Sequence, residues 1–236
     1  MTVRIAQNVG IKKIVNFSKE LGIYENPEEL LSISLGSTET TLLKLVSAYA
    51  AFVNGGKLVE PILIDRVQDS EGNTIVNNEK RSCKDCSQIS FTSQKYPKID
   101  DKYKKVFSSQ TAYQVTSLLE GVIQRGTGKK LRKLNLNLAG KTGTTNENTD
   151  AWFIGFTSNL VVGVYVGMDN PAPLGKFETG SKTALPIFES FIKNSVKKSD
   201  ARPFKVSDGI TMMVVDSLTG QKVKFSARDT IIEAYK

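Results

Sequence analysis

The sequence predicts an α+β domain in which helices cover a mostly antiparallel sheet. Helical and strand-like apolar patterns alternate along one chain, and the runs of strand length are separated by short turns. Of the 236 residues, 39% are apolar, which is enough for a sizeable core. We expect residues 1–200 to form the main domain and residues 201–236 to form a C-terminal extension with a β-hairpin.

The first half of the chain predicts two helices and a hairpin. Apolar side chains recur at near-helical spacing over residues 2–21, and Gly22 follows as a stop signal. A broad apolar face predicts a buried second helix over residues 40–54, capped by Thr40 or Thr41. The β-rich runs LVEPILIDRVQD and NTIV follow, and the Ser-Glu-Gly-Asn between them has the chemistry of a hairpin turn.

Residues 77–105 are predicted to be a surface insertion, because they are polar and show little apolar periodicity. The insertion contains Cys83 and Cys86, the two cysteines of the chain, as C-x-x-C. With no histidine and no further cysteine, a closed zinc site is not expected, and the strand-to-helix context of a thioredoxin motif is missing. We interpret the pair as a loop staple or an ordinary thiol pair. A disulfide would imply an oxidising compartment.

The second half predicts a helix, three strands, another helix and a hairpin. Residues 108–124 form the helix, which Gly126-Thr127-Gly128 closes. The strands lie in LNLNLAGKTGTT, WFIGFTS and LVVGVYVGMD, as neighbours in a core sheet. The next helix spans residues 182–197, and the hairpin turns at Leu218-Thr219-Gly220. The side chains expected to face inward from that helix are Leu185, Phe188, Phe191, Ile192 and Val196, with Pro186 in its first turns.

Composition excludes several classes of function. The chain has no histidine, so Ser-His-Asp and Cys-His catalysis are ruled out. Its 32 basic and 24 acidic residues give a charge of +8, but the two signs are interleaved, which favours a solvated surface over a nucleic-acid interface. No apolar run reaches the ~20 residues of a membrane span, and the first residues lack the features of a signal peptide. Taken alone, the chain is expected to be soluble.

The sharpest chemical motif is Lys141-Thr142-Gly143-Thr144-Thr145. On a strand that edges a cleft, a cation, two hydroxyls and the backbone amides can bind a carboxylate and an oxyanion together. Gly143 suits such a strand, because a side chain there would obstruct the approach of a ligand to the backbone. Lys-Thr-Gly is short enough to arise by chance, so the alternative is a strand followed by a polar turn.

Four sequence blocks, one of which contains the motif, together indicate a protein family. SLGSTETTLLKLVSAYAAFVNGGKLVEP, LLEGVIQRGTGKKL, LAGKTGTTNENTDAWFIGFTSNLVVGVYVGMDN and TGSKTALPIFESFI follow one another with sensible spacing. Over most of its length the chain thereby resembles the transpeptidase domain of class A penicillin-binding proteins, the bifunctional peptidoglycan synthases. The resemblance implies that residues 1–200 are the C-terminal portion of this domain.

The resemblance also implies a role for each motif residue. Lys141 would hold the active-site hydroxyl network and help proton movement. Thr142 and Thr144 would bind the carboxylate of a stem peptide or β-lactam, the Thr144 amide would form half of the oxyanion hole, and Gly143 and Thr145 would lie beside the substrate. No metal, cofactor or nucleic acid is implied.

Two motifs of the family are missing from their expected places. No Ser-x-x-Lys precedes Lys141, and Ser-x-Asn is absent from the sequence. The Ser-x-x-Lys at Ser195 to Lys198 follows Lys-Thr-Gly, in a charged helix end that we interpret as a solvated terminus. We therefore expect the chain to begin just past Ser-x-Asn, as a piece of a longer protein that is inactive by itself.

The parent protein is expected to have an N-terminal membrane anchor, a glycosyltransferase domain, and a periplasmic or extracellular location. Self-association through the exposed apolar face of residues 2–21 is a further expectation. The alternative function is a non-catalytic module that uses its basic surface to bind anionic glycan, a membrane or nucleic acid.

Overall fold

A computed structural model describes residues 1–84, 86, 98–224 and 229–236. Its centre is an antiparallel sheet with the strand order β5 (Ala139–Thr144), β6 (Ala151–Phe156), β7 (Val161–Val166). Strands β6 and β7 are joined by a turn in which Thr157 N–H donates to the Leu160 carbonyl oxygen at 2.9 Å. The predicted α+β class and the three neighbouring antiparallel strands are therefore confirmed.

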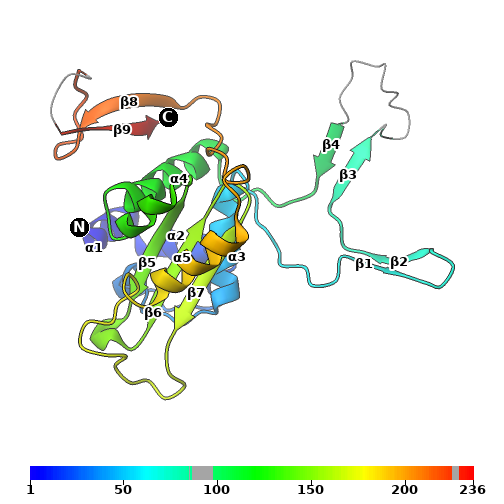
Figure 1. Ribbon diagram of the computed structural model, residues 1–236, viewed down its shortest axis with the longest axis horizontal. Coiled ribbons are helices and arrows are strands. Elements are labelled where there is room, and N and C mark those ends of the chain that lie inside the picture. Colours follow the sequence, from blue (N-terminus) through cyan, green and yellow to red (C-terminus); the bar gives the residue numbers. More distant parts are fainter. Residues whose placement is uncertain (85, 87–97, 225–228) are drawn as a thin grey trace.

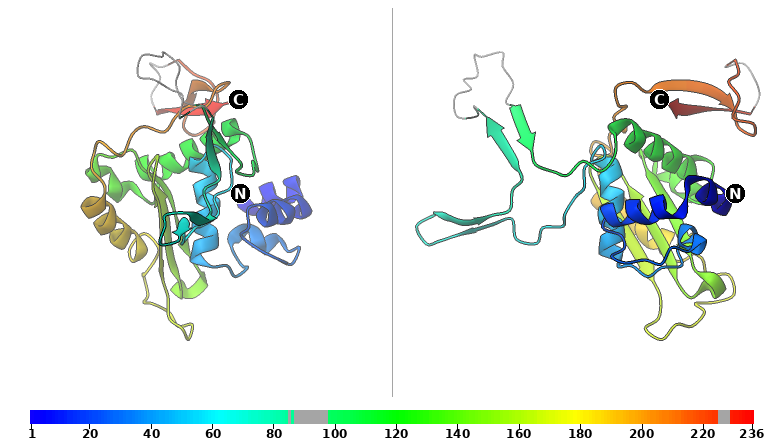
Figure 2. Two further views of the ribbon diagram at one scale, coloured as in Figure 1. Left: turned by 90° about the vertical axis from the view of Figure 1, so that its right-hand side faces the viewer. Right: turned by 180° about the vertical axis from the view of Figure 1, so that it is seen from behind.

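Helices cover both faces of this sheet (Figure 2). On one face, α5 (Ala184–Ser195) packs against β6, where the Phe153 and Phe188 rings lie 4.8 Å apart. On the other face, α3 (Leu42–Val53) lies so close to β7 that a Cβ at Gly163 would approach Val46 Cγ2 to 2.5 Å. The core is thus divided into two layers, with the sheet between them.

Two of the helices beside the sheet, α3 and the helix that begins at Ser109, start at hydroxyl caps. The Thr41 side chain accepts a hydrogen bond from Lys44 N–H at 3.2 Å, and the Ser108 side chain accepts one from Thr111 N–H at 3.1 Å. The second of these helices, α4 (Ser109–Gln124), packs along β5 and leads into the 3₁₀ helix η3 (Lys129–Leu134). Thr41 is one of the two caps that the sequence predicted for α3.

The predicted helix over residues 2–21 is wrong as a single element. The structure contains α1 (Thr2–Val9) and α2 (Ile11–Glu20), separated at Gly10, whose φ of +94° is incompatible with a continuous helix. A 3₁₀ helix, η1 (Leu31–Leu35), packs against α1. Within the described part of the chain, no helix is long and apolar enough to cross a membrane.

Within 57–105, the described residues 57–84, 86 and 98–105 leave the domain as a projecting arm (Figure 1). Its two ends meet where Val106 N–H donates to the Gly56 carbonyl oxygen at 2.8 Å and Leu58 N–H donates to the Lys104 carbonyl oxygen at 2.8 Å. The arm carries two hairpins, whose strands are β1 (Arg66–Gln68), β2 (Thr74–Asn77), β3 (Arg81–Lys84) and β4 (Lys98–Asp101).

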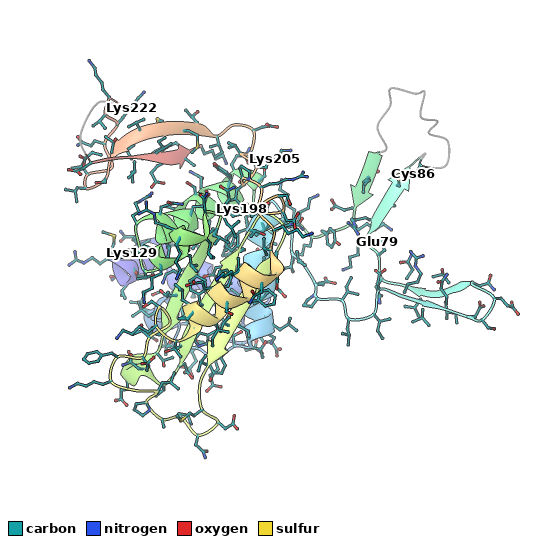
Figure 3. All side chains as sticks on the ribbon, viewed as in Figure 1. Glu79, Cys86, Lys129, Lys198, Lys205 and Lys222 are labelled. Atoms are coloured by element: carbon teal, nitrogen blue, oxygen red, sulfur yellow. A yellow bond between two sulfur atoms is a disulfide. The ribbon has the colours of Figure 1, made fainter. Side chains whose placement is uncertain are left out.

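The hairpin predicted around residues 70–73 is confirmed by β1 and β2. Glu79 lies between the two hairpins, as Figure 3 shows, and its carboxylate binds the Arg81 guanidinium at 2.6 Å. Cys83 and Cys86 form a disulfide with a Cα–Cα distance of 5.7 Å. Of the two interpretations of C-x-x-C, the structure contains the loop staple. Residues 85 and 87–97 of the predicted insertion lie outside the described residues.

The C-terminal extension forms a hairpin of β8 (Thr211–Asp216) and β9 (Thr230–Tyr235). The predicted turn is present, because Gly220 N–H donates to the Asp216 carbonyl oxygen at 2.9 Å. The returning strand is different from the predicted one, since the described residues 221–224 after the turn form one isolated bridge, Val215 to Lys222, and β9 pairs along all of β8. The six consecutive pairs with β9 offer β8 a longer ladder than the residues at the turn.

Two side chains are less buried than predicted. Phe191 of α5 is 46% exposed, because the buried stripe of that helix follows Leu185, Phe188 and Ile192, and Phe191 lies on its flank. Leu43 lies in α3, which was predicted to be a buried helix, and its side chain is 60% exposed.

Candidate functional site

The Lys-Thr-Gly motif lies on β5, at the edge of the central sheet. The register pairs Lys141 with Ile154, and its other edge pairs with no strand among the described residues. The Lys141 side chain is exposed, and its Nζ donates to the Thr142 carbonyl oxygen at 2.7 Å. A cation therefore lies along an open strand edge, where a ligand can approach the backbone.

Thr142 has a hydroxyl partner that the sequence analysis did not assign to the site. Its Oγ1 lies 3.0 Å from Oγ1 of Thr127, in the Gly-Thr-Gly loop that follows α4. Thr127 is exposed and Thr142 is half-buried. The available signal was the Gly-Thr-Gly block itself, which the sequence analysis used as a helix stop and a family resemblance. The structure adds the Thr127 hydroxyl to the hydroxyls of Thr142 and Thr144, which were predicted to bind a carboxylate.

Thr144 is held by a loop from much later in the chain. Its hydroxyl accepts a hydrogen bond from Gly180 N–H at 3.1 Å. Gly180 fits there because it has no side chain, since a Cβ would overlap the carbonyl oxygens of Gly143 and Trp152. The loop between β7 and α5 thus reaches the end of the motif strand.

Gly143 lies opposite an aromatic pair. It pairs with Trp152 on β6, and a Cβ on Gly143 would approach Trp152 Cβ to 3.1 Å. The Trp152 and Tyr165 rings lie 4.6 Å apart, and the Tyr165 hydroxyl donates to Asp150 Oδ1 at 2.8 Å. That hydrogen bond to the carboxylate raises the pKa of Tyr165. The aromatic pair therefore packs beside Gly143, and the Tyr165 hydroxyl binds the Asp150 carboxylate.

Thr145 is placed in a turn and makes its contacts there. Its hydroxyl accepts from Asp150 N–H at 2.8 Å and lies 2.7 Å from the Thr149 hydroxyl. The short 3₁₀ helix η4 (Asn146–Asn148) lies between these residues and brings the chain back to β6. Of the five predicted site residues, Lys141 to Thr144 lie along the strand, whereas the Thr145 hydroxyl closes the turn.

The serines of α5 lie far from this arrangement in the fold. Besides the Ser-x-x-Lys at Ser195 to Lys198, the sequence contains a second one that was missed, Ser190 to Lys193, five residues earlier. Both serines are exposed on α5, and Lys198 lies just beyond that helix (Figure 3). Helix α5 packs on the face of Phe153, whereas Lys141 shares the opposite face with Ile154. The sheet separates these serines from the Lys141 side chain.

A pocket elsewhere does not involve the motif. It has a volume of about 430 Å³ and is lined by residues 23–27 and by residues of the segment 38–44. The motif site is therefore a strand edge with polar groups along it, and this pocket is a separate feature.

The chain is similar to known proteins over most of its length. Residues 1–193 match the family described as penicillin binding protein transpeptidase domain. The chain is 44% identical, over its full length, to penicillin-binding protein 1A of Rickettsia prowazekii, and covers 30% of that protein. It is similar to the crystal structure of penicillin-binding protein 1A from Haemophilus influenzae, with a TM-score of 0.81 and 29% identity over 98% of this chain and 38% of the other.

A third similarity concerns the fold alone. PonA1 of Mycobacterium tuberculosis, solved in complex with penicillin V, has a TM-score of 0.59 and 21% identity over 80% of this chain and 50% of the other.

The chain belongs to the penicillin-binding protein transpeptidase family. The resemblance to class A penicillin-binding proteins is thereby confirmed, because the full-length similarities are to proteins named penicillin-binding protein 1A. The chain spans about 30% of the length of these curated relatives.

Proposed function

We propose that this chain supplies the carboxylate-binding strand of a peptidoglycan D,D-transpeptidase and binds stem peptides and β-lactams there. The observation that carries the proposal is the arrangement on the open edge of β5, where Lys141 lies beside Thr142 and the Thr127 hydroxyl lies 3.0 Å from the Thr142 hydroxyl. Membership of the transpeptidase family supports it.

The chemistry follows from the residue types. Two neighbouring hydroxyls can each donate to one carboxylate, and the ammonium group of Lys141 supplies the opposite charge. The Thr144 N–H would stabilise the oxyanion that develops when the substrate carbonyl is attacked. In the parent protein, a serine outside this chain would attack the D-Ala-D-Ala peptide bond, form an acyl-enzyme ester and release the terminal D-alanine. An amine on a neighbouring strand would then take the acyl group and free the serine.

The chain by itself would bind ligand without turnover. The serines of its two Ser-x-x-Lys sequences are on α5, on the other side of the sheet from Lys141. The membrane anchor, the glycosyltransferase domain and the periplasmic or extracellular location belong to the proposed parent protein.

Titration with an N-acetylated D-Ala-D-Ala dipeptide tests the binding, with amide NMR shifts as the readout. We expect the largest shifts at residues 141–144 and 127. Thr142→Val should weaken binding about tenfold, because it removes a hydrogen bond to a charged group. Thr211→Val, on the exposed first position of β8, is the matched control and should leave the Kd unchanged.

Shifts that avoid β5, or equal Kd values for both variants, would contradict the proposal. The polyanion-binding alternative predicts a different result, namely binding of a sulfated glycan with an affinity that falls steeply as salt is added.

A further inference from the structure

The C-terminal hairpin lies across α4, the helix that ends at the Gly-Thr-Gly loop (Figure 1). Gln114 Nε2 donates to the Ala234 carbonyl oxygen at 3.1 Å, and the Tyr113 hydroxyl lies 3.9 Å from Met212 Sδ. At the other end of the helix, Arg125 Nη2 donates to Glu233 Oε1 at 2.6 Å. The hairpin therefore contacts α4 along its length, with an ion pair at the end nearest the site.

Arg125 connects the hairpin to the end of α4. It is the C-cap residue of α4, two positions before Thr127. Its guanidinium folds back over the helix at Gly121, where a Cβ would lie 3.0 Å from Nη2. The Glu233 side chain is 17% exposed and that of Arg125 is 44% exposed, so the ion pair is partly shielded from water.

The Gly-Thr-Gly loop depends on the end of the helix for its position. Gly126 N–H and Gly128 N–H both donate to the Val122 carbonyl oxygen, at 3.1 and 3.0 Å. Between them, Thr127 directs its hydroxyl to Thr142 on β5. A shift of the last turn of α4 would therefore move the Thr127 hydroxyl relative to the motif strand.

We propose that Glu233 is a positioning residue, which acts through Arg125 to hold Thr127 against Thr142 and so sets how the strand binds a carboxylate. The binding half of this inference rests on the proposed function. Under it, the C-terminal hairpin is part of the machinery of the site, although none of its residues touches the ligand.

The test compares Glu233→Gln with Glu189→Gln. Glu189 is a matched control, because it pairs with Lys133 at 2.7 Å and its side chain is 20% exposed, but it joins α5 to the far end of η3, five residues beyond Gly128. Two quantities are measured on the full chain: amide hydrogen exchange at residues 126–128 and 142, and the Kd for the acetylated D-Ala-D-Ala dipeptide and for its C-terminal amide, which has no carboxylate.

We expect Glu233→Gln to speed exchange in the loop and to raise the Kd of the free acid about three- to fivefold, the range of a partly shielded ion pair. The Kd of the C-terminal amide should stay unchanged, which distinguishes positioning from general destabilisation. Adding Arg125→Gln to Glu233→Gln should cause no further loss, because both changes remove the same ion pair. Glu189→Gln should alter none of these values.

Equal exchange and equal Kd values for Glu233→Gln and Glu189→Gln would overturn the inference. Equal weakening of the acid and the amide would also overturn it, since that result indicates a general structural effect. If the unmodified chain binds neither ligand, the proposed function fails, and the hydrogen exchange still decides whether Glu233 positions the loop.

Discussion

The N–H of Gly180 donates to the Thr144 hydroxyl at 3.1 Å, across 36 residues of sequence. A hydroxyl that accepts this bond keeps its own proton available as a donor. The loop between β7 and α5 therefore orients Thr144 as a donor at the end of the Lys-Thr-Gly strand. This is the geometry that a bound carboxylate requires.

Gly180→Ala should break the hydrogen bond from Gly180 N–H to the Thr144 hydroxyl. The added methyl group would overlap the carbonyl oxygens of Gly143 and Trp152, so the loop must move away from β5. We expect a loss of stability of about 1–3 kcal/mol in urea denaturation, as for other overpacked sites. The amide signal of Thr144 should shift as well. Ser181→Ala is the control, because Ser181 contacts the neighbouring Thr179 hydroxyl at 3.0 Å and its loss leaves the loop in place; equal stability of the two variants would contradict the prediction.

Gly163→Ala tests how closely α3 packs on the sheet. The new Cβ would lie 2.5 Å from Val46 Cγ2 and 2.8 Å from Leu42 Cδ1, so the helix must retreat. We expect a destabilisation of about 1–3 kcal/mol, measured by thermal or urea unfolding. Leu43→Ala, on the exposed side of the same helix, should change stability by less than about 0.5 kcal/mol. If Gly163→Ala leaves the free energy of unfolding unchanged, α3 does not pack closely on β7.

Glu120 predicts an unusual dependence of stability on pH. Burial raises the pKa of this carboxyl from 4.5 to about 7. Between these two pH values the folded state binds more protons than the unfolded state, so the free energy of unfolding falls as the pH rises. Above pH 7 the loss is complete, on the order of 2 kcal/mol, because the side chain is only half-buried and solvent screens part of the effect.

The measurement is urea unfolding of the chain and of Glu120→Gln at pH 5 and pH 8. At pH 8, Glu120→Gln should be more stable than the unmodified chain. It should also lose less stability between pH 5 and pH 8. A parallel pH dependence in both proteins would show that Glu120 does not cause it.

The exposed apolar side chains of α1 predict self-association. Val3, Ile5 and Val9 are 37, 55 and 46% exposed, and Ala6 is the buried residue of this helix. Burying such a face against a second copy removes apolar area from water. Light scattering should show a mass that rises with protein concentration, and Ile5→Lys should keep the chain monomeric. A constant monomer mass for the unmodified chain would refute this prediction.

Local patterns predicted most elements, since their signals lie within a few residues. The predicted cap Thr41 and the predicted turn at residues 70–73 are each a short-range effect, as is the cap Ser108, which was not predicted. The break at Gly10 was missed because one glycine inside an apolar periodicity is compatible with a helix, and only the fold shows its positive φ.

The sequence did not predict which segments pair when they lie far apart in the chain. The strand after the turn at Gly220 was expected next to β8, whereas β9 occupies that place from further along the chain. In the site, the motif residues on β5 were predicted from the Lys-Thr-Gly block. The contacts of Thr127 with Thr142 and of Gly180 with Thr144 join segments 15 and 36 residues apart, and no periodicity encodes them.

Incubation with benzylpenicillin, followed by intact mass measurement, tests whether any serine of the chain is acylated. We expect no adduct, because Ser190 and Ser195 are exposed on α5 and lie on the opposite face of the sheet from Lys141. A nucleophilic serine requires an adjacent base and an oxyanion hole, and neither exposed position on α5 lies beside the Lys-Thr-Gly strand that would provide them. Ser190→Ala and Ser195→Ala are measured alongside. An adduct that disappears in one variant would identify that serine as the nucleophile. An adduct that persists in both variants would require another nucleophilic serine. Either result would contradict the proposal that the chain binds ligand without covalent turnover.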